Sequence, residues 1–482
     1  MNDSLAVLLP GFSGTVAPDW VTRMLAEGMG GVCLFGENVK SAAHLAALTA
    51  ELHEASPHAL IAIDEEGGDV TRLYQAVGSP FPGNAVLGRL DNPSLTRAVG
   101  EQVGWELRSA GVDFTLAPDV DVNSNPLNPV IGVRSFGDQP ALVARHGAAW
   151  IDGVQSTGVA ACAKHFPGHG DTSQDSHVAL PVVDASEEVI RERDVASFAA
   201  AIAAGVKAIM TSHIVMPALD SEPATFSSRI LQGLLRDELG FEGLIITDAL
   251  DMAGASADRG IPAAAVAAIA AGADLLCIGT SNSEAQMRHI AAALDDAVAA
   301  GELPAERLAE AAARVRALGA HTAQARQLQP VPSDLVTGLV QGLTLETVSQ
   351  AFAVSDAAKA VLAEHEGLPF VWLKLESSHN IAVGDSPWGP FAPGIISAAA
   401  TLTPGESVEP LMAAASEGLP VLVGKDNHRH EFAQQAIAAL RARGPVLVVD
   451  MGWPDLDREY ADIATFGASR LVGKALVTRI DP

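Results

Sequence analysis

The segment KHFPGHGDTSQDSH, residues 164–177, concentrates side chains that can transfer protons or bind polar ligands. Its titratable residues are Lys164, His165, His169, Asp171, Asp175 and His177. Asp175 precedes His177 by two positions, so its carboxylate can orient the imidazole while the other ring nitrogen exchanges a proton with a substrate. The spacing predicts an acid/base dyad, although a capping aspartate beside a structural histidine also fits the local sequence.

The histidines of this segment, His165, His169 and His177, are also conceivable metal ligands. Their spacing matches no zinc signature closely, so we expect neither a metal ion nor a cofactor.

Asp248 directly follows the apolar run Gly243–Thr247, and its carboxylate is suited to covalent chemistry. A carboxylate can attack an anomeric carbon while a second group protonates the leaving oxygen, which is the retaining route of glycoside cleavage. Lys164 offers a rival chemistry, because a lysine at the end of a barrel strand can form the Schiff base of an aldolase. Sequence position alone leaves this alternative open.

Short apolar runs that alternate with amphipathic segments indicate the elements that carry these residues. The eight runs are Leu5–Leu9, Gly31–Phe35, Leu60–Ile63, Val112–Leu116, Val159–Ala163, Ala208–Thr211, Gly243–Thr247 and Asp274–Ile278. Helical spacing of apolar residues marks Ser41–Leu52, Pro93–Ala110 and Ala263–Ala271. Eight strand–helix units predict an α/β protein with a (β/α)8 TIM barrel. A doubly wound open sheet is less favoured because no G-x-G-x-x-G follows a strand.

Polar residues follow five of these strands, where a barrel enzyme builds its active site. They are Asp64, Glu65 and Glu66 after the third strand, Asp119 and Asp121 after the fourth, Lys164 and His165 after the fifth, His213 after the sixth, and Asp248 and Asp251 after the seventh. A solvated strand end or a helix cap explains any one of them. Together they predict a functional site.

A second domain is expected after the barrel. Around His321–Ser333 the periodic pattern gives way to Gln and Pro, which is typical of a linker. We therefore expect a catalytic domain at residues 1–325, a linker at 326–333 and a smaller α/β sandwich-like domain at 334–482. Its expected strands are Phe370–Leu375, Pro420–Val423 and Val446–Val449, and its expected helix is Glu431–Arg443.

Composition and charge exclude several classes of protein. Hydrophobic residues make up 48% of the chain and charged residues 18%, which is not the composition of a disordered protein. A net charge of −28 argues against nucleic-acid or anionic-lipid binding. The cysteines Cys33, Cys162 and Cys277 lie in apolar runs, so we expect buried free thiols. The N-terminal residues carry no basic n-region, and no run is long enough to span a membrane, so we expect a cytoplasmic protein.

Five sequence segments together resemble glycoside hydrolase family 3, in its bacterial β-N-acetylglucosaminidase (β-N-acetylhexosaminidase) branch. They are IDEEGG, APDVDVNSNPLNPVIGVRSFG, KHFPGHGDTSQDSH, MTSHIVMPALD and GLIITDALDM, all within the first 320 residues. The resemblance implies that His177 is the acid/base, with Asp175 as its partner, and that Asp248 is the nucleophile. It also implies that Asp64, Arg134, Lys164 and His165 bind the sugar hydroxyls and that His213 lines the same subsite.

Two departures from the family pattern affect specificity and the second domain. Glu66-Gly67-Gly68-Asp69 stands where related sequences continue E-G-G-R, and this anion near the pocket disfavours a substrate that bears a lactyl carboxylate. The C-terminal segments VLVVDMGWPD and ATFGASRLVGKAL resemble the second domain of the family. In many members that domain supplies a glutamate as acid/base, but with D-S-H in the barrel we do not expect this role for Glu376, Glu406 or Glu409.

The expected activity is that of a retaining exo-β-N-acetylglucosaminidase, acting on a terminal β-linked N-acetylglucosamine through a covalent glycosyl-enzyme. A phosphorylase with the same dyad is the alternative, because a neutral imidazole does not repel an incoming phosphate as a carboxylate does. The Lys164 aldolase and a sugar-binding protein without catalysis are the alternatives of other classes.

Overall fold

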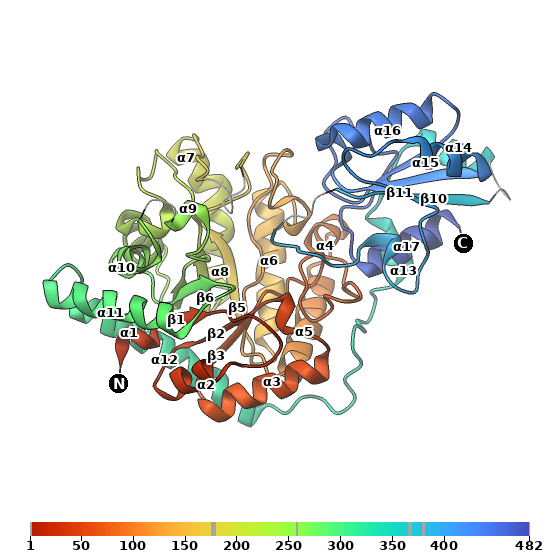
Figure 1. The fold of residues 1–482 in the computed structure, drawn as a ribbon. Coiled ribbons are helices and arrows are strands. Elements are labelled where there is room, and N and C mark those ends of the chain that lie inside the picture. The colour runs from red at the N-terminus through yellow and green to blue at the C-terminus, as the bar shows by residue number, and fades with distance from the viewer. Residues whose placement is uncertain (1, 175–179, 257–258, 365–368, 378–380, 482) are drawn as a thin grey trace.

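The computed structural model describes residues 2–174, 180–256, 259–364, 369–377 and 381–481. Two bodies are visible in Figure 1: a barrel formed by the first part of the chain and a smaller layered unit, in blue, formed by the last part. In the described residues, no helix combines the length and the apolar character that a membrane span requires.

Eight short parallel strands form the curled sheet of the first body. They are β1 (Leu8–Pro10), β2 (Gly31–Leu34), β3 (Leu60–Ile63), β4 (Phe114–Thr115), β5 (Ala160–Phe166), β6 (Ala208–Thr211), β7 (Leu244–Ile246) and β8 (Leu276–Gly279). Strands β2 to β7 pair in sequence order, β1 pairs with β8, and the bridge between Ile246 and Leu275 joins β7 to β8. This arrangement confirms the predicted barrel.

The start of the first predicted strand is wrong. Residues Asp3–Ala6 form a short helix, α1, in place of strand, because Asn2 accepts a hydrogen bond from the backbone N–H of Leu5 and Asp3 favours the first turn. Each of the other predicted runs overlaps an observed strand, although β5 continues to Phe166 and β8 to Gly279, beyond the predicted ends.

Helices surround the strands of the barrel. They are α2 (Asp19–Ala26), α3 (Ala42–Ala55), α4 (Asn84–Leu90), α5 (Pro93–Ser109), α6 (Pro140–Gln155), α7 (Glu187–Val189), α8 (Ala196–Ala203), α9 (Ala253–Ser256), α10 (Ile261–Ala271), α11 (Glu284–Ala300) and α12 (Ala305–Leu328), with π-helical segments at Ile190–Val195 and Arg229–Glu238. The three predicted helices correspond to α3, α5 and α10. Ser41 caps α3, and Asn92 caps α5 before Pro93 at its first position, as these residue types favour.

Part of the segment with linker-like composition, His321–Ser333, is helical. Residues His321–Leu328 are the last turns of α12, because their Ala, Gln, Arg and Leu side chains are good helix formers. Pro330 and Pro332 stop the helix, and no helix or strand occurs between Leu328 and Leu345. The predicted domain boundaries at residues 325 and 334 stay predictions.

The segment after α12 is attached to the barrel along α5. Arg108 donates to the carbonyl of Gln329 at 3.2 Å, and Gln102 donates to that of Val336 at 2.9 Å. The backbone N–H of Gly338 donates to the carboxylate of Glu106 at 2.6 Å. Figure 1 shows this segment running beside the barrel toward the second body.

A six-stranded sheet organises the second body. Its strands are β9 (Ala353–Val354), β10 (Phe370–Leu375), β11 (Ala400–Leu402), β12 (Leu419–Gly424), β13 (Leu447–Asp450) and β14 (Ile463–Ala464). The spatial order is β11-β10-β12-β13-β14-β9, with β9 antiparallel to its neighbour and the other pairs parallel. Its helices are α13 (Leu345–Gln350), α14 (Asp356–Glu364), α15 (Glu409–Ala414), α16 (Glu431–Arg441) and α17 (Arg470–Ile480).

Both faces of this sheet are covered, because successive side chains of a strand point to opposite faces. Val421 and Val423 of β12 belong to the apolar cluster shared with α13 and α17, and Leu422 belongs to the cluster shared with α15 and α16. The predicted C-terminal strands and helix are confirmed as β10, β12, β13 and α16. The second body is therefore the predicted α/β layer unit (Figure 1).

Candidate active site

A cavity of about 340 Å³ lies at the carboxyl ends of the barrel strands. Five of the predicted site residues line it: Asp64, Arg134, Lys164, His165 and Asp248. Its floor is apolar, formed by Cys33, Leu116, Met210 and Cys277, which come from β2, β6 and β8 and the end of β4. Alternate barrel strands contribute one layer of inward side chains, which explains this set. All three cysteines are free and buried, as predicted.

Lys164 is the centre of a buried ion network. Its ammonium Nζ lies 2.7 Å from Oδ1 of Asp64 and 2.9 Å from Oε1 of Glu66. Arg134 also binds Glu66, with Nη2 at 2.8 Å from Oε1 and Nε at 3.1 Å from Oε2. Burial disfavours the charged forms of both Lys164 and Glu66. The neighbouring charges outweigh this effect: Asp64 and Glu66 raise the pKa of Lys164. Arg134 and Lys164 lower the pKa of Glu66 far below its usual value.

The raised pKa of Lys164 has a chemical consequence. An ammonium held by two carboxylates donates hydrogen bonds to hydroxyls but has no lone pair with which to attack a carbonyl. The geometry therefore argues against the Lys164 aldolase.

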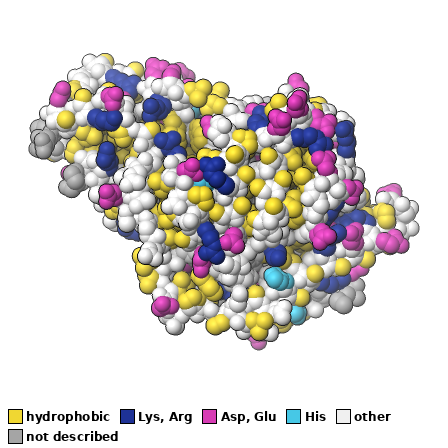
Figure 2. Space-filling view, turned by 180° about the vertical axis from the view of Figure 1, so that it is seen from behind, with side chains coloured by type: hydrophobic (Ala, Val, Ile, Leu, Met, Phe, Trp, Pro, Cys, Tyr) yellow, Lys and Arg dark blue, Asp and Glu magenta, His cyan; other side chains and the backbone are white. Residues whose placement is uncertain are grey.

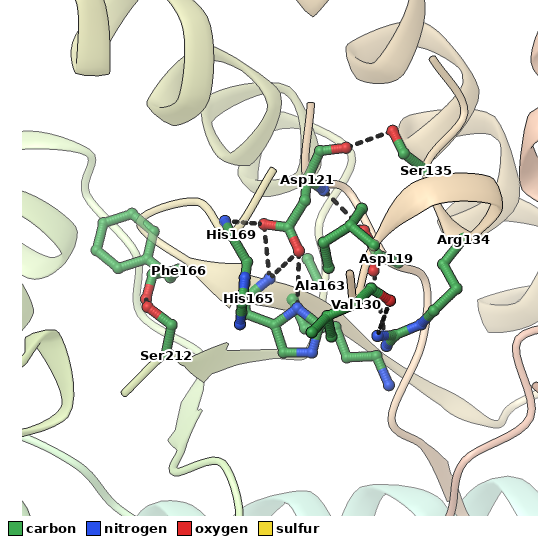
Figure 3. A network of polar contacts seen from close by, with 12 residues as sticks. Asp119, Asp121, Val130, Arg134, Ser135, Ala163, His165, Phe166, His169 and Ser212 are labelled. Atoms are coloured by element: carbon green, nitrogen blue, oxygen red, sulfur yellow. Dashed lines mark hydrogen bonds and ion pairs between the residues drawn. The ribbon is translucent and has the colours of Figure 1, made fainter. Parts of the chain in front are cut away.

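Asp121 holds the end of β5, which carries His165, and the loop after it, which carries His169 (Figure 3). Nδ1 of His165 donates to Oδ2 of Asp121 at 2.7 Å, and the backbone N–H groups of His165 and His169 donate to the same carboxylate at 3.2 and 2.7 Å. Burial lowers the pKa of His165 to about 4, so its imidazole is neutral and its Nε2 is an acceptor. Sequence position placed Asp121 at a strand end, and the structure places it behind His165 rather than in the cavity.

Asp119 contacts both Asp121 and Arg134. Its Oδ1 accepts a hydrogen bond from the backbone N–H of Asp121 at 2.9 Å, and its Oδ2 lies 3.6 Å from Nη2 of Arg134. Burial, with a smaller contribution from the charge of Asp121, raises the pKa of Asp119 to about 8.

Among the described residues, Asp119, Asp121 and His165 could form a metal site, because one ligand atom of each lies within 4.8 Å of the others. The oxygens of Asp121 already accept three hydrogen bonds from N–H groups, and burial favours the protonated form of Asp119. This donor set fits a hydrogen-bonded support better than a cation site. That the protein uses no metal stays a prediction.

Asp248 follows β7 and faces the cavity, and its Oδ1 accepts a hydrogen bond from the backbone N–H of Ala249 at 2.8 Å. His213 was expected to line the same subsite, and it is not among the described residues that line the cavity. Its side chain is fully buried, with Nδ1 at 2.9 Å from Oγ1 of Thr225 and Nε2 at 3.1 Å from the carbonyl oxygen of Ala249. His213 therefore lies behind the loop that follows β7, and its contact with Ala249 positions the residue next to Asp248.

The predicted dyad, Asp175 and His177, lies outside the described residues. Asp171, earlier in the same loop, forms an ion pair with Arg193 at 3.0 Å. His169 is buried, with Nδ1 at 2.8 Å from Oγ1 of Thr172.

Glu66 and Asp251 were expected as polar strand-end residues but not as sugar ligands, and both line the cavity. Glu66 lies two positions after Asp64, and this period-2 spacing, which puts both side chains on one side of the chain, could have indicated a role shared with Asp64. Glu65 points elsewhere, since its Oε2 accepts hydrogen bonds from Thr71 and from the backbone of Arg72 and Leu73.

The second body also reaches this cavity. Ile381 and Ala382 belong to its wall. Arg72, another wall residue, donates to the carbonyls of Ala382 at 2.7 Å and Val383 at 3.1 Å and lies 4.0 Å from Asp64. No sequence signal identified these contacts, because they join residues about 310 positions apart.

Glu376, Glu406 and Glu409 of the second body do not line the cavity that holds Asp248. Glu376 accepts a hydrogen bond from Nε1 of Trp388 at 2.9 Å and pairs with Lys374, and neither Glu406 nor Glu409 lines the cavity. Both of the latter are exposed.

A sequence model described as "Glycosyl hydrolase family 3 N terminal domain" matches residues 13–318, which include the barrel and its site. The chain belongs to glycosyl hydrolase family 3. This confirms the predicted family.

Individual relatives agree with this assignment. The chain is 37% identical over 330 residues to Beta-hexosaminidase A of Pseudoalteromonas piscicida, a match that covers 63% of this chain and 55% of that protein. It is 38% identical over 301 residues to the Beta-hexosaminidase of Thioalkalivibrio sulfidiphilus, covering 61% and 85% of the two chains.

Solved structures extend the similarity to both bodies. The family 3 beta-N-acetylglucosaminidase from Paenibacillus sp. str. FPU-7 has a TM-score of 0.86 and 31% identity, and the match covers 99% of this chain and 96% of that one. A beta-glucoside phosphorylase has a TM-score of 0.78 at 20% identity, covering 99% and 91%, which is a likeness of fold alone.

Proposed function

We propose that this protein is a retaining exo-β-N-acetylglucosaminidase. The observation that carries the proposal is the single cavity in which the Asp248 carboxylate shares its walls with Asp64, Arg134, Lys164 and His165. Its relatives named beta-hexosaminidases and the FPU-7 beta-N-acetylglucosaminidase support the choice of sugar. A volume of about 340 Å³ suits one sugar rather than a chain, which favours cleavage at an end.

In the proposed mechanism, Asp248 attacks the anomeric carbon and forms a covalent glycosyl-enzyme. Lys164 and Arg134 donate hydrogen bonds to the sugar hydroxyls, and Asp64 and Nε2 of His165 accept them. His177, oriented by Asp175, would protonate the leaving oxygen and then activate water. The ion network around Lys164 keeps the charged partners in place before the sugar binds, so little reorganisation accompanies the reaction.

The net charge also fits a small uncharged substrate. In Figure 2 acidic and basic side chains are interspersed over the visible face, with no extended basic field.

The test is product analysis with 4-nitrophenyl β-N-acetylglucosaminide. We expect free N-acetylglucosamine, with the β anomer formed first as detected by proton NMR. An α anomer as first product would contradict the retaining mechanism. Inorganic phosphate as acceptor is the alternative: N-acetylglucosamine 1-phosphate formed at millimolar phosphate would replace the hydrolase by a phosphorylase.

A further inference from the structure

The floor of the active-site cavity carries sulfur atoms that the proposed mechanism does not use. Cys33 of β2, Met210 of β6 and Cys277 of β8 all line this cavity. They belong to one apolar cluster and come from alternate strands, so their side chains form part of one inward layer of the barrel. Two thiols and one thioether, which are soft donors, therefore lie in the same cavity as Asp248.

The thiols of Cys33 and Cys277 are in contact, although one strand separates them. This strand is β1, which pairs with β8, with Leu9 in register with Cys277, and lies next to β2 on its other side. A hydrogen bond with Cys277, together with burial, raises the pKa of the Cys33 thiol well above its ordinary value. Cys277 is 3% exposed and Cys33 is fully buried, so an ion that enters the cavity meets Cys277 first.

The spacing of the strands favours a bridging ion over a disulfide between these two cysteines. Neighbouring strands lie about 4.8 Å apart, so β2 and β8, with β1 between them, are separated by roughly 9 Å. A disulfide requires Cα atoms within about 7 Å of each other. A metal ion between two sulfur atoms adds two bonds of about 2.3 Å each, and this longer bridge fits the wider separation.

The other donors around this floor favour a soft ion over a hard one. The carboxylates of Asp64 and Glu66 already bind the ammonium of Lys164, at 2.7 and 2.9 Å. Leu116, the remaining residue of the floor, offers no donor atom, so the described residues of the floor lack the fourth ligand of a tetrahedral zinc site. Thiolate and thioether donors select Cu(I) and similar soft ions.

The charge around the cavity favours a cation. The described part of the wall carries more carboxylates than basic groups: Asp64, Glu66, Asp248 and Asp251 against Arg72, Arg134 and Lys164. The whole chain has a net charge of −28. A cleft lined by an excess of one sign of charge raises the local concentration of the opposite sign, so cations are drawn toward the sulfur atoms.

We propose that Cys33 and Cys277 bind a soft monovalent cation of the Cu(I) class between their sulfur atoms, with Met210 as a third donor on the same floor. Each thiol loses its proton to solvent, so one cation and two S–H groups give a bridged S–metal–S unit of charge −1 and two released protons. The ion occupies the floor of the sugar cavity, and it therefore inhibits the enzyme and takes no part in catalysis. This effect on the sugar rests on the proposed function, whereas binding of the ion does not.

The test uses Ag(I) as the probe, because it is soft, monovalent and stable in air. Full-length protein is titrated with silver nitrate in a chloride-free buffer with excess free methionine, whose thioether removes weakly held silver, and bound metal is counted by mass spectrometry. We expect one tightly bound Ag(I) per chain, with release of about two protons. Zn(II) under the same conditions should bind at least about tenfold more weakly.

Cys33→Ala and Cys277→Ala each remove one sulfur of the pair and should weaken Ag(I) binding at least about tenfold. Cys162→Ala is the matched control, because Cys162 is a fully buried thiol of β5 and is not among the described residues that line the cavity. This control also leaves two cysteines, but with the pair intact, and should bind Ag(I) as the wild type does. Either cavity variant decides the question if the other does not fold, as judged by its thermal melting curve.

The ion and the sugar should compete for the cavity. Saturating N-acetylglucosamine should weaken Ag(I) binding, and Ag(I) should raise KM for 4-nitrophenyl β-N-acetylglucosaminide at unchanged kcat. Equal Ag(I) binding by the wild type and the Cys33 and Cys277 variants, or equal affinity for Zn(II), would refute the site. A fall in kcat at unchanged KM would refute its competition with the sugar. Release of no N-acetylglucosamine by the metal-free enzyme would refute the proposed function, and the metal count would still decide the ion site.

Discussion

The contact between Asp121 and His165 allows a quantitative test of how the site is organised. The fully buried Asp121 carboxylate accepts hydrogen bonds from Nδ1 of His165 and from two backbone N–H groups. Asp121→Asn replaces one of its oxygens by an NH₂ group that cannot accept. A hydrogen bond to a charged group contributes about 1.5–3 kcal/mol, so we expect the free energy of unfolding to fall by about 3 kcal/mol.

Activity should respond through His165, because the aspartate determines which ring nitrogen carries the proton. A double-mutant cycle with Asp121→Asn, His165→Ala and the double variant measures this coupling in kcat/KM for the nitrophenyl substrate. We expect a coupling energy of about 1.5–3 kcal/mol, which corresponds to a factor of roughly 10 to 150. The double variant should therefore have nearly the same kcat/KM as the less active of the two single variants.

Asp171→Asn is the control for this cycle. Asp171 lies in the same loop, but its ion pair with Arg193 is partly exposed, with 32% exposure of the aspartate side chain. Its loss should cost less than about 1 kcal/mol in unfolding free energy. If the effects of Asp121→Asn and His165→Ala on kcat/KM simply add, then Asp121 does not act through His165 and the reasoning is refuted.

Three further predictions concern the remaining groups. Asp248→Ala should reduce turnover by a factor on the order of 10⁴ or more, and a mechanism-based fluorosugar should label Asp248 in the wild type; mass spectrometry that finds the label on another carboxylate would move the nucleophile. His177→Ala should slow substrates with poor leaving groups far more than nitrophenyl substrates, as measured by kcat/KM across a leaving-group series; equal losses would make His177 structural. Burial raises the pKa of Asp119 to about 8, so between about pH 4 and pH 8 the folded protein keeps a proton there that the unfolded chain loses. The free energy of unfolding therefore declines as pH rises through this range. Asp119→Asn, which stays neutral, should therefore gain unfolding free energy relative to the wild type from pH 6 to pH 8 in urea titrations, and a constant difference would contradict the shift.

The sequence predicted most of the elements for a local reason. Runs such as Leu60–Ile63 and Phe370–Leu375 are apolar without interruption, which buried parallel strands require, and they became β3 and β10 with the predicted bounds. Errors occurred where local signals compete. At Asp3–Ala6 a capping side chain outweighed the apolar run, and at His321–Leu328 helix propensity outweighed the appearance of a linker.

For the site, the sequence determined which residues could take part. Asp64, Lys164, His165 and Asp248 follow or end strands, and parallel strands of a barrel deliver their carboxyl ends to one mouth, so their meeting could be predicted. Only the tertiary structure decided which way each side chain points. It turned His213 behind the loop, where it binds the carbonyl of Ala249, and placed Asp121 beneath His165. It also brought Arg72 to the carbonyl of Ala382, because the packing of the two bodies against each other sets such contacts and no local pattern of residues records them.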